Sequence, residues 1–242
     1  MSIPTLRTAR SNRLLATLPR VSLERIIPSM HLRTLLVRQV LQEGGGVLEG
    51  VLFPIAGVAS MITVSDAGNS VEVATIGSEG MVGLPLFLGG HSSAAEVFVQ
   101  VAGRGLFIGA AEFRRHIEAE SSLARILLLY TQALMTQIAQ GVACASTHRI
   151  VARCARWILQ TDDRVTGEQF LLTHEFLGLM LGVRRASVSE AAQQLQSRGL
   201  IRYRRGMVLV ADRVGLEKVA CECYRLINRE YTRLLRPKRT AA

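Results

Sequence analysis

Side chains that contact nucleic acids are concentrated in two short stretches of the C-terminal half. A guanidinium group forks onto a phosphate or onto O6 and N7 of guanine, a hydroxyl bonds phosphate, and a carboxylate accepts a hydrogen bond from cytosine N4. Both stretches combine these groups at close spacing, which favours a binding surface for DNA over catalysis. The candidate DNA-binding residues are Arg184, Arg185, Ser187, Ser189 and Glu190 in the first stretch and Arg202, Arg204 and Arg205 in the second.

The first stretch follows a sharp turn between two segments of helical periodicity. Gly182 suits a turn that needs positive φ, Gly178 is small enough for two helices to cross there, and Thr173 suits an N-cap. The pattern predicts a helix-turn-helix whose second helix exposes the first group of candidates. Apolar residues at spacings of three and four form its inward face: Phe176, Leu177, Leu181, Val183, Val188, Ala191, Ala192 and Leu195.

The second stretch lies in a predicted β-hairpin. Residues 200–204 alternate like a strand, Arg205-Gly206 suits a tight turn, and residues 207–210 form the returning strand. A basic hairpin beside a recognition helix is placed to hold the phosphate backbone. A solvated surface hairpin is the alternative interpretation.

Positive charge is segregated into the same half. The chain has 29 Lys and Arg against 19 Asp and Glu, of which 11 and 10 occur up to His148 and 18 and 9 after it. Arginine supplies 27 of the 29 basic residues, so a coding bias explains the choice of Arg over Lys. Since that bias does not explain the segregation, we expect a polyanion partner for the C-terminal half.

The chain resembles the Crp/Fnr superfamily of bacterial transcription regulators, with matches in order along nearly its whole length. The resemblance implies an α+β fold with an N-terminal sensory domain at 1–120 that is an antiparallel β-roll with a helical arm, a dimerisation helix at 121–147 and a winged helix-turn-helix at 148–242. The matching residues are Asn12–Ala16, Leu23–Arg25, Leu52–Pro54 with Gly57, Val71–Ala74, Gly80–Gly83, Leu181–Val188 and Cys221–Tyr224.

The N-terminal half independently indicates antiparallel β-structure. Between Gly44 and Gly109, apolar runs of a few residues alternate with breaks such as Asp66–Asn69, and two runs show the two-residue period of strands. With 242 residues, of which 49% are apolar, the chain has enough material for a sheet core and a helical core.

A helical stretch from about Ser121 to Ala145 carries a broad apolar stripe that something must cover. Packing on its own β-roll is one possibility. In the resembled family the equivalent helix forms a parallel dimer seam, and we favour the dimer. Two-fold symmetry would place recognition helices about 34 to 36 Å apart and imply a palindromic operator in double-stranded DNA. The predicted interface residues are Leu123, Leu127, Tyr130, Leu134 and Ile138.

The phosphate clamp of cyclic-nucleotide sensors is missing from the sequence. The family holds the ligand with a Gly-Glu pair and an Arg-Ser/Thr-Ala segment, whereas this chain has Gly83-Leu84 and then Ser92–Glu96 without arginine. Because a buried phosphate without its cation is strongly unfavourable, we predict no cyclic-AMP binding. The effector stays unknown, with a hydrophobic small molecule or no ligand as open alternatives.

No cofactor and no metal are predicted. No cysteine precedes Cys144, as an N-terminal iron–sulfur cluster would require, and zinc-type spacing is missing. All four cysteines are expected on helical segments, where Cys221 and Cys223, separated by one residue, point about 200° apart and do not form a chelating pair. Buried structural thiols are the expected interpretation, and His91 alone is weak support for haem.

Enzyme signatures are absent, and we expect a protein that is not an enzyme. The glycines of Gly103–Gly109 miss dinucleotide spacing and suit a turn between two strands. The basic, polar N-terminus is unlike a signal peptide, so we expect a cytoplasmic protein that does not enter membranes. Its seven arginines within 38 residues suit a solvated arm better than a second phosphate contact.

These observations predict a dimeric, sequence-specific DNA-binding transcription regulator, with RNA polymerase as a further partner. Where the family has Arg-Glu-Thr-Val-x-Arg, this chain has residues 185–190 as Arg-Ala-Ser-Val-Ser-Glu. Ala186 and Glu190 therefore prevent transfer of a known operator, and Glu190 either accepts from a base or pairs with Arg202 or Arg184. The alternative function is a ligand-responsive interaction module with only non-specific DNA binding.

Overall fold

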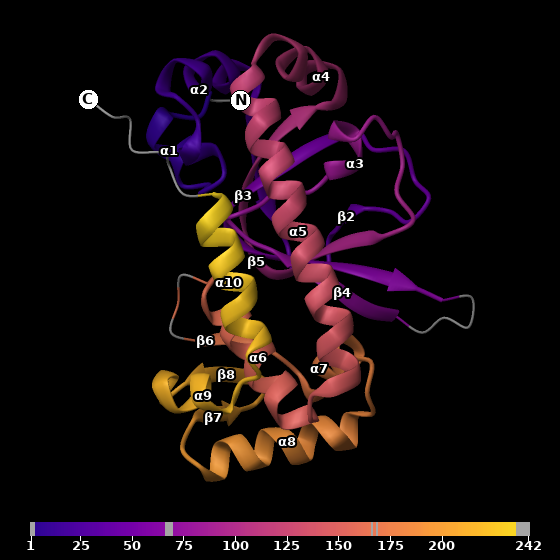
Figure 1. The fold of residues 1–242 in the computed structure, drawn as a ribbon, viewed down its shortest axis with the longest axis vertical. Helices are drawn as coiled ribbons and strands as arrows, with labels where there is room; N and C mark the ends of the chain where they lie inside the picture. Colours follow the sequence, from indigo (N-terminus) through magenta and orange to yellow (C-terminus); the bar gives the residue numbers. More distant parts are fainter. Residues whose placement is uncertain (1–2, 66–69, 166, 168, 236–242) are drawn as a thin grey trace.

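The protein is elongated, with its N-terminal helices and one sheet at one end and helix α8 at the other (Figure 1). The structure is a computed structural model that describes residues 3–65, 70–165, 167 and 169–235, so the predicted break at Asp66–Asn69 lies outside the described residues. Helix α5 (Ser121–Thr147) runs between the two ends and joins them. The α+β class predicted from the sequence is confirmed.

The N-terminal domain is built on an antiparallel sheet in which β5 is central. The strand order is β1-β5-β3-β4, and β2 also pairs with β5. Phe53 pairs with Leu106 in the middle of the sheet, and both side chains are fully buried. The strands are β1 (His31–Leu35), β2 (Val40–Gln42), β3 (Gly50–Val64), β4 (Ser70–Ile76) and β5 (Glu96–Gly109).

The glycine-rich stretch Gly103–Gly109 lies inside β5, so the prediction of a turn there is wrong. Gly103 shows why glycine is needed: a Cβ atom at this position would come within 2.1 Å of the Ala56 carbonyl oxygen on β3. Close approach of two backbones, and not chain reversal, explains this glycine.

Short helices cover one side of the sheet and fill the N-terminal core. The segment predicted as a solvated arm is folded, since Ala9, Leu14 and Leu23 are buried and the Asn12 amide donates to the Pro54 and Gly80 carbonyls at 2.8 and 3.0 Å. The helices are α1 (Leu6–Arg10), α2 (Arg20–Ile26), α3 (Leu84–Phe87) and α4 (Ala110–Ala119), with 3-10 turns at Leu15–Thr17 and Ile27–Ser29.

The C-terminal domain packs helices against a small sheet with strand order β6-β8-β7. Its core contains the fully buried Trp157, Val188 and Leu195. The elements are α6 (Ile150–Asp162), β6 (Gln169–Leu171), α7 (His174–Leu181), α8 (Arg185–Ser197), β7 (Ile201–Arg204), β8 (Met207–Val210), α9 (Arg213–Val219) and α10 (Cys223–Leu234).

Helix α10 returns from the C-terminal domain and packs along α5 (Figure 1). Its buried residues Ile227, Tyr231 and Leu234 join the N-terminal core together with the inner face of α5. These spacings of four and three put one apolar stripe of α10 against α5.

The five residues predicted as a dimer seam lie on this covered inner face, so that assignment is wrong. Leu123, Leu127, Tyr130 and Leu134 are buried within the chain, and Ile138 is half-buried. The Tyr130 hydroxyl even donates to the Met81 carbonyl at 3.0 Å inside the N-terminal domain. Packing on the chain's own domain, the alternative considered above, accounts for this stripe.

The outer face of α5 carries a second set of residues that the chain leaves exposed. Leu128, Met135 and Val142 have 60%, 65% and 68% of their surface exposed. Together with Gln132 and Ala139 they are spaced alternately by four and three residues, which is the repeat of a coiled-coil seam.

By length and hydropathy alone α5 could span a membrane, with a mean hydropathy of 1.2 over 18 residues. Its inner face, however, is part of the hydrophobic core of the protein.

The two domains contact each other where β4 and β5 meet α6 and α7. Phe98 packs edge-on against Phe176 with ring centroids 6.0 Å apart, and the Trp157 indole donates to Glu72 Oε1 at 2.7 Å. Arg164 at the end of α6 forms a buried ion pair with Glu79 at 2.8 Å. The N-terminal and C-terminal domains are therefore packed as one body in this structure.

All four cysteines are buried, as predicted, but the prediction that Cys221 and Cys223 lie on one helix and point away from each other is wrong. Cys221 lies in the non-helical link before α10, and Cys223 is the first residue of that helix. Their sulfur atoms consequently lie with donor atoms of Cys144 and His148 inside one group, all within 4.8 Å of one another.

Candidate nucleic-acid interface

The turn between α7 and α8 has the geometry that its sequence predicts. The Thr173 hydroxyl accepts a hydrogen bond from the Phe176 N–H at 3.1 Å and caps α7. Gly182 ends α7 with φ +63° and ψ 39°, the left-handed conformation that glycine adopts at no steric cost. A Cβ on Gly178 would lie 3.0 Å from the Val183 carbonyl oxygen, which explains a small residue where the chain turns.

The beginning of α8 presents an exposed, charged surface. Arg184, Arg185 and Glu190 are exposed, whereas Val188 and Leu195 on the opposite face are buried in the domain core. Across the parts of the chain that the structure describes, none of these three charged side chains takes part in an ion pair. The predicted pairing of Glu190 with Arg184 or Arg202 is thus not present, and the positive helix N-terminus adds to the attraction for phosphate.

The two predicted serines differ from the charged candidates in being half-buried. The Ser189 hydroxyl donates to the Arg185 carbonyl at 3.0 Å and lies 2.9 Å from His174 Nδ1. Its hydrogen-bonding capacity is therefore used inside the domain, where it fixes α8 against the start of α7. We assign Ser189 a positioning role.

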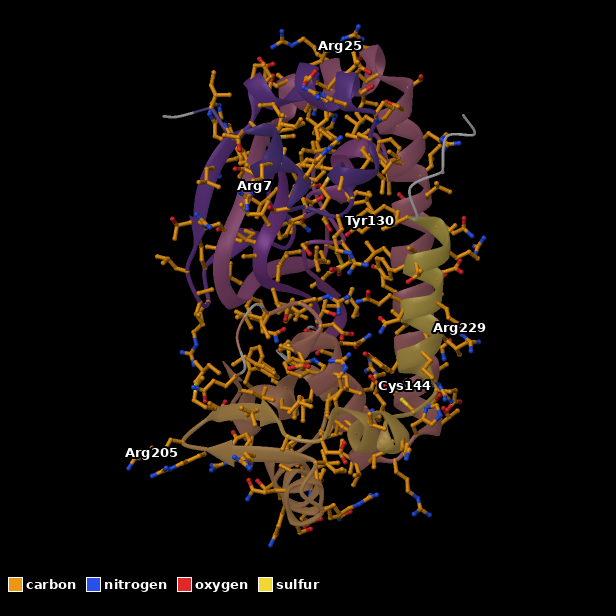
Figure 2. The ribbon with its side chains drawn as sticks, turned by 90° about the vertical axis from the view of Figure 1, so that its left-hand side faces the viewer. Arg7, Arg25, Tyr130, Cys144, Arg205 and Arg229 are labelled. Atoms are coloured by element: carbon orange, nitrogen blue, oxygen red, sulfur yellow. The ribbon has the colours of Figure 1, made fainter. Side chains whose placement is uncertain are left out.

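The predicted hairpin is formed by β7 and β8, in register from Ile201 with Val210 to Arg204 with Met207. Arg205 and Gly206 in the turn both have positive φ, at 49° and 79°, as a two-residue turn that follows the strand twist requires. Arg202, Arg204 and Arg205 are exposed. Figure 2 shows Arg205 projecting from the tip of the hairpin, away from the domain.

His174 connects the hairpin to the helices, a role that the sequence did not reveal. Its ring stacks on Tyr203 with centroids 4.4 Å apart, and the Tyr203 hydroxyl donates to the Leu172 carbonyl. Burial, followed by the nearby Arg185 charge, lowers the pKa of His174, so the ring is neutral at neutral pH. The residues in contact come from three separate segments of the chain. Their spacing in the sequence therefore did not predict this contact.

The remaining basic candidates lie elsewhere on the molecule. Arg7 and Arg25, from the N-terminal segment, lie on the N-terminal domain, and Arg25 and Arg205 are at opposite ends (Figure 2). The N-terminal arginines therefore do not extend the surface formed by α8 and the hairpin. We call that surface, made of the exposed residues Arg184, Arg185, Glu190, Arg202, Arg204 and Arg205, the reading face.

At the sequence position of the family's phosphate clamp, this chain has leucine in place of the expected glutamate. Gly83 has φ +90° and begins the short helix α3, whose Leu84 and Leu86 side chains are buried in the N-terminal core. The residue that replaces the expected glutamate is thus part of the packing.

A separate cavity of about 420 Å³ lies between the two domains. It is lined from β4, α5, α6 and α7, and includes Glu72, Gln137, Arg156 and Gln160. Gln137 and Gln160 are 3% and 2% exposed, and each has one side-chain atom without a hydrogen-bond partner among the described residues. The sequence gave no indication of this site, because its lining comes from four elements.

The fold and the reading face together define the class of protein. Residues 152–219 match the family model described as the Crp-like helix-turn-helix domain. The chain therefore carries a helix-turn-helix domain of the Crp type and has the overall fold of Crp/Fnr transcription regulators, as the sequence resemblance predicts.

Particular solved structures give the extent of the similarity. FixK2 from Bradyrhizobium japonicum has 15% sequence identity and a TM-score of 0.68, covering 79% of this chain and 98% of that one. A regulator from Eubacterium rectale assigned to the Crp/Fnr family has 15% identity and a TM-score of 0.67 over 87% and 98%. The c-di-GMP-responsive regulator CLP of Xanthomonas campestris has 15% and 0.65 over 79% and 99%. No curated protein matches the sequence.

Proposed function

We propose that the protein is a homodimeric, sequence-specific DNA-binding transcription regulator that acts in the cytoplasm. The observation that carries the proposal is the reading face, where five exposed arginines and one glutamate surround α8 and the hairpin without an intramolecular ion pair among the described residues. Exposed arginines without internal partners are free to exchange their counterions for DNA phosphates.

The roles within this face differ. Arg185 and Glu190 on α8 read base edges, Arg184 and Ser187 contact the nearby backbone, and the three hairpin arginines hold phosphates. RNA polymerase remains a partner implied by the family resemblance alone. The domain assignment at 1–120, 121–147 and 148–242 is part of the same proposal.

The experiment is a binding titration with genomic fragments at two salt concentrations. Arg185→Ala is expected to lose about 1 to 3 kcal/mol of discrimination between fragments while it retains non-specific affinity. Arg7→Ala, which removes the same charge from an exposed site on the other domain, is the matched control and should bind like the wild type. Equal affinity for every fragment would instead favour the non-specific interaction module.

For the dimer, we propose the exposed face of α5 as the seam. Leu128, Met135 and Val142 follow a coiled-coil repeat over a long helix, and a second copy in parallel would cover all three. The resulting two-fold axis would set two α8 helices about 34 to 36 Å apart and match a palindromic operator.

Light scattering during size-exclusion chromatography tests this seam. Met135→Glu places two like charges across the axis and is expected to yield monomers. Val21→Glu changes another exposed apolar residue, 60% accessible on α2, and should leave dimers intact. A wild-type monomer at high micromolar concentration contradicts the proposal.

We further propose that cyclic AMP is not the effector. Leu84 and Leu86 occupy the core beneath the expected clamp, and the described segment from Ser92 to Glu96 contains no cation. Isothermal titration is expected to give no binding heat with cyclic AMP. A micromolar dissociation constant would overturn this part of the proposal.

A further inference from the structure

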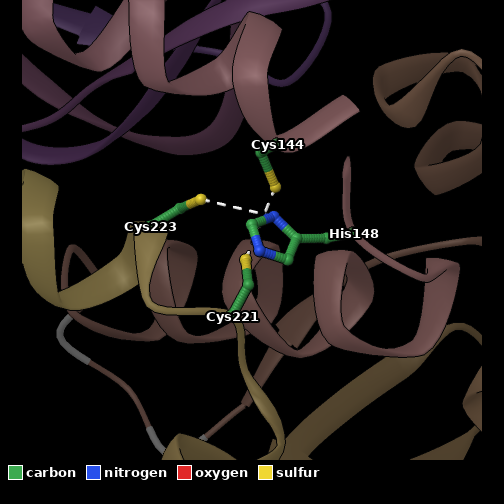
Figure 3. Close-up of side chains that lie close together, drawn as sticks. All are labelled: Cys144, His148, Cys221 and Cys223. Atoms are coloured by element: carbon green, nitrogen blue, oxygen red, sulfur yellow. Dashed lines mark hydrogen bonds between the residues drawn. The ribbon is translucent and has the colours of Figure 1, made fainter. Parts of the chain in front are cut away.

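Three cysteines and one histidine converge where α5 ends and α10 begins. Figure 3 shows their side chains pointing toward one another from separate segments of the chain. One donor atom from each lies within 4.8 Å of all the others, and the three cysteines are buried. We call this set, Cys144, His148, Cys221 and Cys223, the cysteine–histidine cluster.

Two distances within the cluster are close to those of a tetrahedron around a single zinc ion. Zinc–sulfur bonds of about 2.3 Å and zinc–nitrogen bonds of about 2.0 to 2.1 Å place two sulfurs roughly 3.8 Å apart and a sulfur and a nitrogen roughly 3.6 Å apart. Sγ of Cys144 and Sγ of Cys221 are separated by 3.4 Å, and Sγ of Cys223 lies 3.6 Å from His148 Nδ1. The other pairs of donor atoms lie within 4.8 Å of each other.

Hydrogen bonds around the cluster orient His148 so that one ring nitrogen is available to bind a cation. His148 Nε2 lies 3.1 Å from Glu222 Oε1. A proton on Nε2 donates to that carboxylate and leaves the Nδ1 lone pair directed at the cluster, the arrangement found behind metal-bound histidines. The Thr147 hydroxyl, 3.2 Å from Nδ1, gives its own hydrogen to the Ala143 carbonyl at 2.7 Å.

One sulfur atom also has a hydrogen-bond donor directed at it. The Gln140 amide donates to Cys223 Sγ at 3.1 Å, and Cys223 is the first residue of α10, so its Sγ lies near the positive end of the helix dipole.

Two other interpretations fit the cluster less well. A Cys144–Cys221 disulfide would use two of the four groups and leave the histidine and its carboxylate partner without a role. An iron–sulfur cluster spreads its thiolates over several iron atoms, whereas these four donor atoms all lie within 4.8 Å of one another, close enough to share one ion. A mixed sulfur and imidazole set in a closed site is the ligand choice of structural zinc.

We propose that the cysteine–histidine cluster binds one Zn²⁺ ion and thereby joins the end of α5 to the start of α10. His148 lies two residues before the start of α6 and Cys221 lies two residues after the end of α9, so the ligand pairs bracket the whole helix-turn-helix domain. The ion links the two segments on either side of that domain and fixes the orientation of the domain relative to α5. A metal ion that joins the ends of a long loop stabilises a fold in this way. This site is separate from the reading face.

Metal analysis of the full-length protein, purified with a thiol reductant, tests the proposal. We expect close to one zinc per chain, zinc–sulfur distances of about 2.3 Å by X-ray absorption, and visible d–d bands of tetrahedral thiolate coordination when Co²⁺ replaces zinc. Cys144→Ser and Cys223→Ser are expected to lose the metal. Glu222→Ala should weaken zinc binding about 10- to 100-fold.

Cys154→Ala is the matched control, because Cys154 is equally buried but lies in the core of the C-terminal domain; it should retain one zinc. Circular dichroism of each variant separates loss of ligand from loss of fold, and the wild-type spectra test the site without any substitution. A wild-type protein that binds no zinc, contains iron instead, or shows only a Cys144–Cys221 disulfide by mass spectrometry overturns the proposal.

One consequence rests on the proposed DNA binding. If the ion orients the helix-turn-helix domain, zinc removal by a chelator lowers specific DNA affinity, and added zinc restores it. Zinc content and Co²⁺ spectra are measured without DNA, so failure of DNA binding and failure of the metal site give different results.

Discussion

Arginine is used in opposite ways at two regions of this molecule. At the junction between the domains, Arg164 has only 5% of its side chain exposed and forms an ion pair with Glu79 at 2.8 Å. On the reading face, Arg184, Arg185 and Arg204 are exposed and have no ion-pair partner among the described residues. Charges that hold the fold are thus internally neutralised, and the charges for which we propose a DNA partner are left available.

The junction contains a second contrast, between two buried carboxylates that both face α6. Glu79 meets a cation, whereas Glu72 accepts a hydrogen bond from the Trp157 indole. Burial raises the pKa of Glu72 to about 7, an effect that its hydrogen bonds and the more distant Arg156 and Arg164 charges oppose. A buried carboxyl group without an adjacent cation therefore favours its neutral form.

The largest expected effect comes from breaking the buried ion pair. Arg164→Ala leaves Glu79 as an uncompensated buried charge, and we expect the free energy of unfolding to fall by about 3 to 5 kcal/mol. Urea denaturation at neutral pH measures it. Arg225→Ala, an exposed arginine on α10 outside every ion pair of the described residues, is the control and should change stability little; equal effects would contradict the comparison.

The pH dependence of stability tests Glu72. Since its pKa is raised in the folded state, the folded protein holds an extra proton between about pH 4.5 and pH 7. Stability from this group is present at acidic pH and is lost as the pH rises through that window, by up to about 3 kcal/mol. Glu72→Gln should flatten this part of the profile and be the more stable protein at pH 8.

Denaturation of the wild type and Glu72→Gln at a series of pH values gives the comparison. The same substitution at the exposed Glu43 should leave the profile unchanged. Parallel profiles for the wild type and Glu72→Gln would show that Glu72 has the same pKa in the folded and unfolded states, so that burial does not shift it.

On the reading face, Arg204→Ala is expected to weaken binding to all DNA sequences alike. Loss of one phosphate contact reduces the slope of log affinity against log salt by about 1. Fluorescence anisotropy over a salt series measures the slope. A loss confined to one sequence would assign Arg204 to base recognition instead.

A smaller effect is expected at the helix cap that positions the turn. Thr173→Ala removes the acceptor of the Phe176 N–H and should cost about 1 kcal/mol of stability, while Thr173→Ser should retain most of it. Thermal unfolding monitored by circular dichroism compares the three proteins. An unchanged midpoint for the alanine variant would show that water replaces the cap.

Turn residues and the spacing of apolar residues predicted the helix-turn-helix and the hairpin, because the residues that determine each of these motifs are close together in the sequence. Gly182 adopts the positive φ that its place in the turn requires, and Arg205 and Gly206 form the tight turn between β7 and β8. The Crp/Fnr resemblance, carried by separated motifs, predicted the order of the domains.

The sequence did not predict which face of α5 is exposed or which cysteines lie together, because both depend on tertiary packing. The broad apolar stripe of α5 shows that a face must be covered, but only its packing against the N-terminal domain and α10, with Ile227 and Tyr231 in the same core, determines which side remains exposed. The cysteine–histidine cluster was missed for a related reason: Cys221 precedes α10 and Cys223 is its first residue, so helical geometry did not apply to the pair.

Genome-wide footprinting with the purified protein tests the central claim, that the reading face recognises particular DNA sequences, most directly. We predict a limited set of protected sites with dyad symmetry and half-sites one helical turn apart, about 10 to 10.5 base pairs, which Arg185→Ala loses and Arg7→Ala keeps. Uniform protection across the genome, or none at low salt, would contradict it.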